Sequence, residues 1–415
     1  MPEPRGVTAA GLTRRAFLKR GAATAVSSLF VVKSLPLIAA DTVQMPFANG
    51  LRKLAQFPQK RPLIVMSWRP PQLETPFEVF NESLLTPNDA FFVRYHLSGI
   101  PTSIDPDQFR VNVKGSVNRP LELSMADIKN KFEPVEFIAV NQCSGNGRAF
   151  TNPRVGGGQS GNGTMGNAKW KGARLRDVLH KAGVKAGAKQ VTFNGLDKGV
   201  TDKVPDFVKA LEIDHALHED TLLGYEMNGE PLPMLNGFPL RLIVPGHYGT
   251  YWVKHVNEIT VVDEPFAGFW MVTGYRIPDN DCACVPPGTK PDKTRPIGRY
   301  DVRSFFTSLT NQHAILAGKT INVRGIAFDG GYGITQVLFS DDGGENWREA
   351  QLGKDMGKYS FREWTIPFTP KKPGMYVLKV KATNRVGQSQ PMEPLWNPAG
   401  YMRNVVETVR IMATA

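Results

Sequence analysis

The chain has 415 residues, of which 41% are hydrophobic and 21% charged, the composition of a soluble globular protein that can form about two or three domains. The formal net charge is +12, yet no run of lysine and arginine is interleaved with aromatic residues, so a nucleic-acid partner is not expected. A moderate positive charge favours an anionic small substrate or an acidic protein partner.

The first 40 residues have the pattern of an export signal. Arg14 and Arg15 are followed by Phe-Leu-Lys and then by a modestly apolar stretch over residues 21–40 that ends in small residues. This order resembles a twin-arginine signal peptide, which exports folded proteins and therefore hints at a cofactor inserted before export. The alternative is a membrane anchor, but Lys33 and several glycine and serine residues make the stretch a poor span. We expect a signal peptide over residues 1–40, a periplasmic protein and no membrane span in the mature chain.

The elements predicted after the signal are of mixed type. Residues 41–82 are rich in proline and isolated apolar residues, which predicts an extended arm over the surface. Apolar periodicity predicts a short amphipathic helix over residues 174–182, ended by Gly183. Strands are predicted over residues 135–140, 240–244 and 257–262. Short mixed elements joined by glycine- and proline-rich loops predict an α+β fold.

The last part of the chain has an all-β pattern. Residues 286–296 contain four prolines and form the predicted linker. Beyond it, residues alternate over 376–382 as in a half-buried strand, and residues 340–347 have the composition of a hairpin turn. The roughly 110 residues up to the C-terminus fit an immunoglobulin-like sandwich. The predicted domains are therefore residues 41–285 and 286–415.

Two further motifs have structural rather than functional interpretations. Residues 156–166 are rich in glycine, but they lack the ending of a phosphate-binding loop and follow no predicted strand, so a flexible loop is expected. His215 and His218 lack the glutamate or third ligand of a zinc protease site, which favours a solvated helix face. No Gly-x-Ser-x-Gly elbow supports a serine hydrolase.

Three cysteines are too few for a disulfide framework. Cys282 and Cys284 flank one alanine, which in an extended segment is too close for an easy bridge, so we expect small buried residues in a loop. Cys143 differs, because it lies in a polar turn after an apolar run with Arg148 close behind and no disulfide partner. The chain has no Cys-x-x-Cys-His motif, so no haem is expected on it.

Three segments combine cations with hydrogen-bonding aromatic residues, namely residues 91–96, 143–148 and 274–279. Each alone could be structural, with its arginine paired to a carboxylate or its tyrosine hydroxyl buried. Together with residues 237–241 and 253–254, in this order, they resemble the molybdopterin-binding core of the sulfite oxidase family, and most of all its bacterial periplasmic sulfite dehydrogenases. The resemblance implies a molybdopterin-binding catalytic domain over residues 41–285 and an immunoglobulin-like dimerisation domain over residues 286–415.

The resemblance implies a molybdenum–molybdopterin cofactor with Cys143 as the only protein ligand to the metal. A soft thiolate suits a metal that two dithiolene sulfurs already hold, and the charge of Arg148 would favour the thiolate. The residues implied to hold the pterin and its phosphate are Phe92, Val93, Arg94, Tyr95, His96, Asp197, Asn236, Arg241, Trp252, Val253 and Lys254. Arg241 and Lys254 bring the positive charge that a phosphate requires.

The implied substrate is sulfite, a small anion that needs fixed cations when it leaves water. Arg94 and Arg148 match the family's substrate arginines, and Tyr275 matches its active-site tyrosine. His96 could add a hydrogen-bond donor and a pH-sensitive charge.

A third substrate arginine is not at the place where the family has it. Ala399 stands there, and Arg403, one helical turn later, is the candidate replacement. The motif therefore does not provide the third cation of the expected anion site at its usual position.

The implied reaction is oxygen-atom transfer from the molybdenum centre to sulfite, after which two electrons leave singly. With no haem expected on this chain, the acceptor would be a separate cytochrome c or haem subunit, and the C-terminal domain implies a possible homodimer. One alternative is a related molybdenum enzyme acting on another sulfur compound, such as a sulfane dehydrogenase or a sulfoxide reductase. Another is an exported binding protein that has kept the fold and lost the metal.

Overall fold

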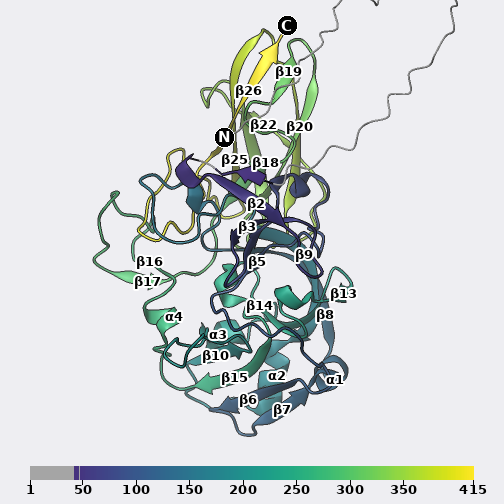
Figure 1. Ribbon diagram of the computed structural model, residues 1–415, viewed down its shortest axis with the longest axis vertical. Helices are drawn as coiled ribbons and strands as arrows, with labels where there is room; N and C mark the ends of the chain where they lie inside the picture. The colour runs from purple at the N-terminus through teal and green to yellow at the C-terminus, as the bar shows by residue number, and fades with distance from the viewer. Residues whose placement is uncertain (1–41, 46) are drawn as a thin grey trace, which may run out of the picture. The chain divides into compact units, whose positions relative to one another are not determined.

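The computed structural model describes residues 42–45 and 47–415, and Figure 1 shows the course of this part of the chain. The signal peptide expected over residues 1–40 lies outside the described residues. Strands predominate over helices in the described chain, and its longest helix has eight residues, so the α+β expectation overstated the helical content. Isolated helices this short are marginally stable, so these segments depend on tertiary packing. No described helix is long and apolar enough to span a membrane.

The N-terminal segment forms a sheet rather than an arm over the surface. Its antiparallel strands follow chain order: β1 (Thr42–Gln44), β2 (Leu51–Ala55), β3 (Leu63–Ser67), β4 (Gln72–Glu74) and β5 (Val93–Arg94), with the 3-10 helices η1 (Phe47–Asn49) and η2 (Phe77–Asn81) between them. Leu63, Leu73 and Tyr95 are fully buried in one small core, because strand pairing brings these residues together. The last strand of this sheet delivers Arg94.

Two further sheets occupy the middle of the chain. One has the order β11-β10-β15-β6-β7, with β15 parallel to β6, and consists of β6 (Arg110–Gly115), β7 (Leu121–Ser124), β10 (Gln190–Gly195), β11 (Lys209–Glu212) and β15 (Val256–Val262). The other has the order β13-β12-β9-β8 with β14 beside β12, and consists of β8 (Pro134–Gln142), β9 (Met165–Arg174), β12 (Leu222–Met227), β13 (Glu230–Pro231) and β14 (Arg241–Ile243). The three strands expected in this region are confirmed as β8, β14 and β15.

The helices are short. They are α1 (Met125–Asn130), α2 (Leu175–Ala182), α3 (Ile213–Ala216) and α4 (Phe269–Val272), with the 3-10 helices η3 (Arg148–Phe150), η4 (Met234–Asn236) and η5 (Gly249–Tyr251). The helix expected over residues 174–182 is confirmed as α2, whose Leu175, Val178 and Leu179 are fully buried. Gly183 follows α2 with φ of 70°, the left-handed conformation that ends many helices.

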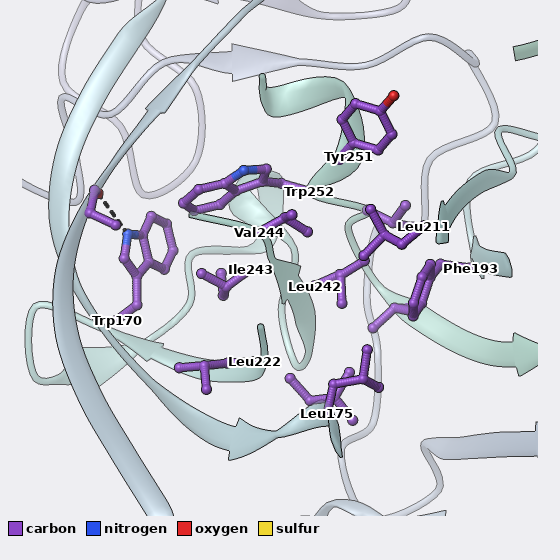
Figure 2. Close-up of a cluster of buried hydrophobic side chains, with 14 of the residues drawn as sticks. Trp170, Leu175, Phe193, Leu211, Leu222, Leu242, Ile243, Val244, Tyr251 and Trp252 are labelled. Carbon is purple, nitrogen blue, oxygen red and sulfur yellow. Dashed lines mark hydrogen bonds between the residues drawn. The ribbon is translucent and has the colours of Figure 1, made fainter. Parts of the chain in front are cut away.

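A core of buried apolar side chains joins the middle sheets, and Figure 2 shows part of it. The Trp170 indole N–H donates to the Ala139 carbonyl O at 3.0 Å, so this fully buried side chain has its polar atom satisfied. Trp170 and Trp252 contact each other with ring centroids 5.4 Å apart. The Arg241 guanidinium lies 5.6 Å from both ring centroids, so the packing of the two indoles determines where this cation is held.

The C-terminal part contains two sheets that share one core. The first has the order β18-β20-β24-β23, consisting of β18 (Arg303–Phe306), β20 (Ile321–Phe328), β23 (Gln351–Leu352) and β24 (Arg362–Phe368). The second has the order β19-β26-β25-β21-β22, consisting of β19 (Ala314–Leu316), β21 (Ile334–Ser340), β22 (Arg348–Glu349), β25 (Gly374–Asn384) and β26 (Glu407–Thr414). Leu378, Val380 and Ala382 of β25 are buried as the alternation predicted, and β21 and β22 pair across the expected hairpin. The immunoglobulin-like topology stays a prediction.

The predicted linker is partly a strand. Residues 286–296 end in β17 (Thr294–Pro296), which pairs with β16 (Arg276–Pro278) directly after Tyr275. The domain boundaries drawn on either side of this segment stay predictions.

Cys282 and Cys284 form a disulfide, and Cys282 is exposed, so the expectation of two buried free thiols is wrong. The segment is not extended as that expectation assumed. Ala283 has φ of 47°, and the Asn280 side-chain amide donates to the Cys284 carbonyl O at 2.8 Å, so the chain turns and brings the two sulfurs together.

The two histidines near α3 have different surroundings. His218 is exposed as expected, but His215 is half-buried, with its ring centroid 4.1 Å from that of His247. Burial lowers the pKa of His215 to about 4, so it is neutral near pH 7. Exposure is therefore confirmed for His218, which lies two residues beyond the end of α3, while His215 lies in α3 but is not solvated as expected.

Candidate active site

One cavity gathers residues from distant parts of the chain. Nine of the residues marked in the sequence line it: Phe92, Arg94, His96, Cys143, Asn236, Arg241, Trp252, Lys254 and Tyr275. Sequence reasoning missed six other lining residues, which are Asn141, Ser144, Phe207, Leu235, Gly249 and Thr250. The three cationic and aromatic segments of the sequence thus meet at one place.

Cys143 follows β8 in a turn held by backbone hydrogen bonds. Its N–H donates to the Thr164 carbonyl O at 2.9 Å, and its carbonyl O accepts the Asn146 N–H at 3.0 Å. β8 pairs with β9 as far as Gln142 opposite Met165, which determines where the turn begins. Cys143 is half-buried and is the only free cysteine among the described residues. A thiol held on a cavity wall in this way can bind a ligand or a metal.

The glycine-rich segment over residues 156–166 supports this turn. The two carboxylate oxygens of buried Glu74 each accept a backbone N–H, from Gly161 and Gly163, at 2.8 Å. The Gly161 carbonyl O in turn accepts the N–H of Gly147 at 2.7 Å. Burial raises the pKa of Glu74 to about 7, although both N–H donors act in the opposite direction. Anchored at these points, the segment is not the flexible loop that its composition suggested.

Residues after β5 alternate between the cavity and the core. Arg94 and His96 line the cavity, whereas Tyr95 is fully buried between them. The Tyr95 hydroxyl forms a hydrogen bond with His255 Nε2 at 2.6 Å. The Arg94 guanidinium donates to the Tyr95 carbonyl O, which directs this cation along the cavity wall.

His96 is held by an aromatic ring and a hydroxyl group. Its ring lies parallel to that of Phe207, with centroids 3.7 Å apart, and its Nε2 forms a hydrogen bond with the Tyr275 hydroxyl. Burial, and next the positive charge of Arg94, hold the pKa of His96 well below its usual range. Near pH 7 the ring is therefore neutral, so His96 can act as a hydrogen-bond partner but not as the pH-sensitive charge expected from the sequence.

Tyr275 is buried in a rare backbone conformation, with φ of 60°. The Lys209 ammonium lies 5.3 Å from its ring centroid. Burial raises the pKa of the Tyr275 hydroxyl, which stays protonated and available as a donor. The neighbouring Arg276 instead donates to the Met271 carbonyl O at 3.0 Å, so it has a structural role.

Arg241 and Lys254 form the cationic end of the cavity. Arg241 donates to the Asn236 carbonyl O at 3.1 Å, and burial lowers its pKa to about 10. Lys254 donates to the Arg94 carbonyl O at 2.7 Å and lies 4.1 Å from the Tyr95 ring centroid. Burial, and next the charge of Arg241, lower the pKa of Lys254 to about 7.

A further buried cation, Lys60, was not found from the sequence. Its ammonium donates to the Phe91 carbonyl O at 3.0 Å and to the Asn236 side-chain oxygen. The amide of Asn236 donates to the Phe92 carbonyl O at 3.0 Å. Burial lowers the pKa of Lys60 to about 7. Lys60 lies in a proline-rich segment with no recognisable motif, so only the fold reveals that it positions Asn236.

The cavity cations share an unusual property, because within the described chain none of them forms an ion pair with a carboxylate. Arg94, Arg241 and Lys254 donate instead to the neutral backbone carbonyls of Tyr95, Asn236 and Arg94. A buried charge without a counter-charge costs several kcal/mol. Such an arrangement is maintained where an anion is to be bound.

Six of the marked residues do not line the cavity. Val93, Tyr95 and Val253 are buried in the core, and Asp197 is buried with its charge interacting with Lys254. Arg148 and Arg403 also lie outside the lining.

The two arginines outside the lining differ in their partners. Arg148 donates to the carbonyl oxygens of Ala399 and Gly158 at 2.9 and 3.0 Å. Arg403 pairs with Glu407, with Nη1 and Oε1 3.5 Å apart. The charge of Arg403 is therefore already compensated, whereas that of Arg148 is not.

Several buried polar atoms of the cavity wall have no hydrogen-bond partner among the residues that the structure describes. They are both side-chain polar atoms of Asn141, the hydroxyls of Ser144 and Thr250, and Nε of Arg241. Native proteins leave few buried polar groups unsatisfied, so these atoms indicate a polar ligand. Asn141 and Ser144 flank the Cys143 turn, but nothing in their spacing distinguished them from ordinary turn residues.

Comparisons with known proteins agree with this geometry. Residues 97–270 match a family model described as the oxidoreductase molybdopterin binding domain, and residues 294–414 match the Mo-co oxidoreductase dimerisation domain. Arg94, His96 and Tyr275 lie outside the matched residues, yet the fold brings them into the cavity.

The chain is similar to mitochondrial sulfite oxidase of Rattus norvegicus, with 32% identity over 91% of this chain and 69% of the rat protein. It is also similar to sulfite oxidase of Arabidopsis thaliana, with 32% identity over 86% of this chain and 96% of the plant protein. Among solved structures, sulfane dehydrogenase SoxCD of Paracoccus pantotrophus has the same fold, with a TM-score of 0.71 and 23% identity over 88% of this chain and 90% of that chain.

Proposed function

Because the chain belongs to the sulfite oxidase family of molybdopterin oxidoreductases, we propose that it oxidises sulfite to sulfate and passes the electrons singly to a cytochrome c. The observation that supports this best is the cavity itself. It combines one free thiol with cations that donate to neutral carbonyl oxygens and, among the described residues, form no ion pair with a carboxylate. A small dianion is the substrate that such a site accommodates.

The cavity residues fit a molybdenum–molybdopterin group. Among the described residues no cluster of three or more His, Cys, Asp or Glu side chains can hold a metal, so a metal bound at Cys143 must bring most of its ligands with it. A pterin that carries two sulfur ligands meets this requirement. The unpartnered polar atoms of Asn141, Ser144 and Thr250 match a group rich in donors and acceptors.

Each part of the cofactor would have its own residues. Cys143 would ligate the metal, while Arg241 and Lys254 would hold the phosphate, supported by Asn236. When bound, the molybdenum centre supplies oxygen-atom transfer and the accompanying two-electron redox change. The protein orients the substrate toward it and provides the electrostatic environment. Lys254, with its pKa lowered to about 7, would regain its charge beside a phosphate.

The substrate would lie on the side of the cavity where Arg94, His96 and Tyr275 meet. Arg94 provides a charge without a counter-ion. The Tyr275 hydroxyl, protonated because burial raises its pKa, donates a hydrogen bond to an oxyanion, and neutral His96 holds that hydroxyl in place. Burial of these groups excludes water and strengthens each interaction with a bound anion.

We further propose a periplasmic enzyme exported by the twin-arginine route and assembled as a homodimer. Support for export is the paired-arginine pattern of the first 40 residues. Support for the dimer is the match of residues 294–414 to a dimerisation domain.

Oxidation of another sulfur compound, such as a sulfane, is the second candidate. The position of Arg403 favours this candidate. Arg403 was the expected third substrate cation, but its Nη1 lies 3.5 Å from Glu407 Oε1. A cavity with fewer free cations suits a substrate of lower charge.

Purified protein from a host that makes the cofactor tests both candidates. We expect about one molybdenum per chain and reduction of cytochrome c only when sulfite is added. Molybdenum without activity on sulfite, but with activity on a sulfane substrate, selects the second candidate. Protein without molybdenum from such a host contradicts both.

A further inference from the structure

The C-terminal segment over residues 396–403 lies directly against the turn that carries Cys143. Its Trp396 indole N–H donates to the Pro153 carbonyl O at 2.8 Å, and its Met402 N–H donates to the Ser144 carbonyl O at 3.2 Å. Arg148 donates in return to the Ala399 carbonyl O at 2.9 Å. A segment of the dimerisation-domain match therefore supports the turn that carries Cys143.

Tyr401 is the side chain of this segment that connects two candidate substrate-binding groups. Its ring is parallel to that of Tyr275, with an angle of 6° and centroids 5.5 Å apart. The Arg148 guanidinium lies 5.0 Å from the centroid of the Tyr401 ring. Tyr401 itself does not line the cavity, so it acts through these two neighbours.

The Asn397 side chain and a neighbouring glycine determine the position of the Tyr401 main chain. Buried Asn397 donates from its side-chain amide to the Tyr401 carbonyl O at 2.8 Å, and its side-chain oxygen accepts the Tyr401 N–H at 3.1 Å. Gly400 allows a close approach, because it has φ of 59° and a Cβ there would lie 2.9 Å from Arg148 Cγ.

We propose that Tyr401 is a positioning residue for anion binding, which holds Arg148 and Tyr275 in the arrangement that receives the substrate oxyanion. The proposal rests on sulfite oxidation as the function of the site and extends it to a residue of the C-terminal segment. Two neutral carbonyl oxygens and the face of the Tyr401 ring together hold the Arg148 guanidinium, and among the described residues it pairs with no carboxylate, so its charge stays available to an anion. Removing the ring would let Arg148 move while leaving the metal ligand untouched.

The test is Tyr401→Leu in the molybdenum-loaded enzyme. We expect KM for sulfite to rise about tenfold, the size of a cation–aromatic contact in a desolvated site, with kcat changed less than about threefold. Sulfate, a redox-inert anion, should bind more weakly by a similar factor in isothermal titration calorimetry. Tyr401→Phe keeps the ring and should restore both values to within about threefold of the unsubstituted enzyme.

Tyr332→Leu is the matched control, because Tyr332 also has an arginine near its ring, with Arg299 at 5.8 Å. Neither Tyr332 nor Arg299 lines the cavity, whereas Tyr401 stacks on the cavity residue Tyr275. It should leave KM and sulfate affinity unchanged. If Tyr401→Leu does not fold, Tyr401→Met fills similar space and makes the same test.

Three results would overturn the proposal: unchanged KM and sulfate affinity in Tyr401→Leu, equal losses in Tyr401→Phe and Tyr401→Leu, or loss of molybdenum from Tyr401→Leu. Failure of the proposed function is separate. In that case the unsubstituted enzyme does not oxidise sulfite, and the sulfate titration still decides whether Tyr401 positions an anion site.

Discussion

The molecule contains two groups of buried cations that lie close to the Cys143 turn but are compensated differently. In one group, Arg303 and Arg403 share Glu407, with distances of 3.1 and 3.5 Å to its Oε1. In the other group, the cavity cations such as Arg94 and Arg241 donate only to neutral carbonyls. The difference separates charges that stabilise the fold from charges that are kept for a ligand.

The largest effect is a loss of turnover, expected from Cys143→Ser in the cavity that is kept for a ligand. Serine lacks the soft sulfur that suits a metal already held by sulfur, so molybdenum-dependent turnover should fall at least about 100-fold. Because Cys143 is only half-buried, the free energy of unfolding should change by less than about 1 kcal/mol. Metal analysis, the cytochrome c assay and urea unfolding measure these quantities. Appreciable turnover in this variant would show that Cys143 is not the ligand.

A large loss of stability is expected from Glu407→Gln, which removes the carboxylate that Arg303 and Arg403 share. The substitution leaves two arginines without a counter-charge, and Arg303 is only 1% exposed. The unfolding free energy should fall by about 3 kcal/mol in urea titrations. Glu258→Gln, which breaks the exposed ion pair with Lys114, is the control and should cost less than about 1 kcal/mol. Equal effects of the two variants would remove the distinction between the two groups of cations.

A third variant, Arg94→Gln, tests whether a cavity cation is dispensable for folding. It should raise KM for sulfite about 10- to 100-fold, because a fixed charge facing the anion is lost. The unfolding free energy should not fall, since no carboxylate is left unpaired and the cost of holding an uncompensated charge is removed. Arg348→Gln, which breaks an exposed pair with Asp341, is the matched control for removal of an arginine. A stability loss as large as that of Glu407→Gln would mean that Arg94 supports the fold.

The smallest effect concerns pH and Lys209. Burial lowers the pKa of Lys209 from 10.5 to about 7, so between these values the unfolded chain holds a proton that the folded chain has released. Stability should therefore rise with pH above about 7, and the contribution of Lys209 between pH 7 and pH 8 is about 1 kcal/mol. Lys209→Met should remove this increment from the pH dependence of urea unfolding. An unchanged pH dependence in this variant would show that Lys209 is not a buried cation of low pKa.

The sequence was informative where a structural feature depends on residues that are close together along the chain. The alternation in β25 and the spacing in α2 depend on local periodicity, so both were predicted correctly. The N-terminal sheet was missed, because Leu63 and Leu73 form a core only after strands from separate segments pair. The disulfide of Cys282 and Cys284 was missed because it depends on the turn at Ala283.

The candidate site shows the same division. A lone cysteine in a polar turn, together with Arg94 and Tyr275 in separate motifs, was recognisable as a set in the sequence alone. Lys60 was not recognisable, since its partner Asn236 is 176 residues away along the chain. The same holds for Tyr401, whose stacking on Tyr275 joins the C-terminal segment to the cavity.

By itself, the sequence determined the chemical groups of this protein: a cysteine in a polar turn close to an arginine, an excess of cations, and motifs similar to those of molybdopterin oxidoreductases. Only the tertiary structure decided which cations remain free. Arg403, expected in the anion site, is paired with Glu407, whereas Arg148 is left with carbonyl partners and the face of Tyr401. The physical reason is that compensation of a charge depends on distances through space and on burial, and neither follows from spacing along the chain.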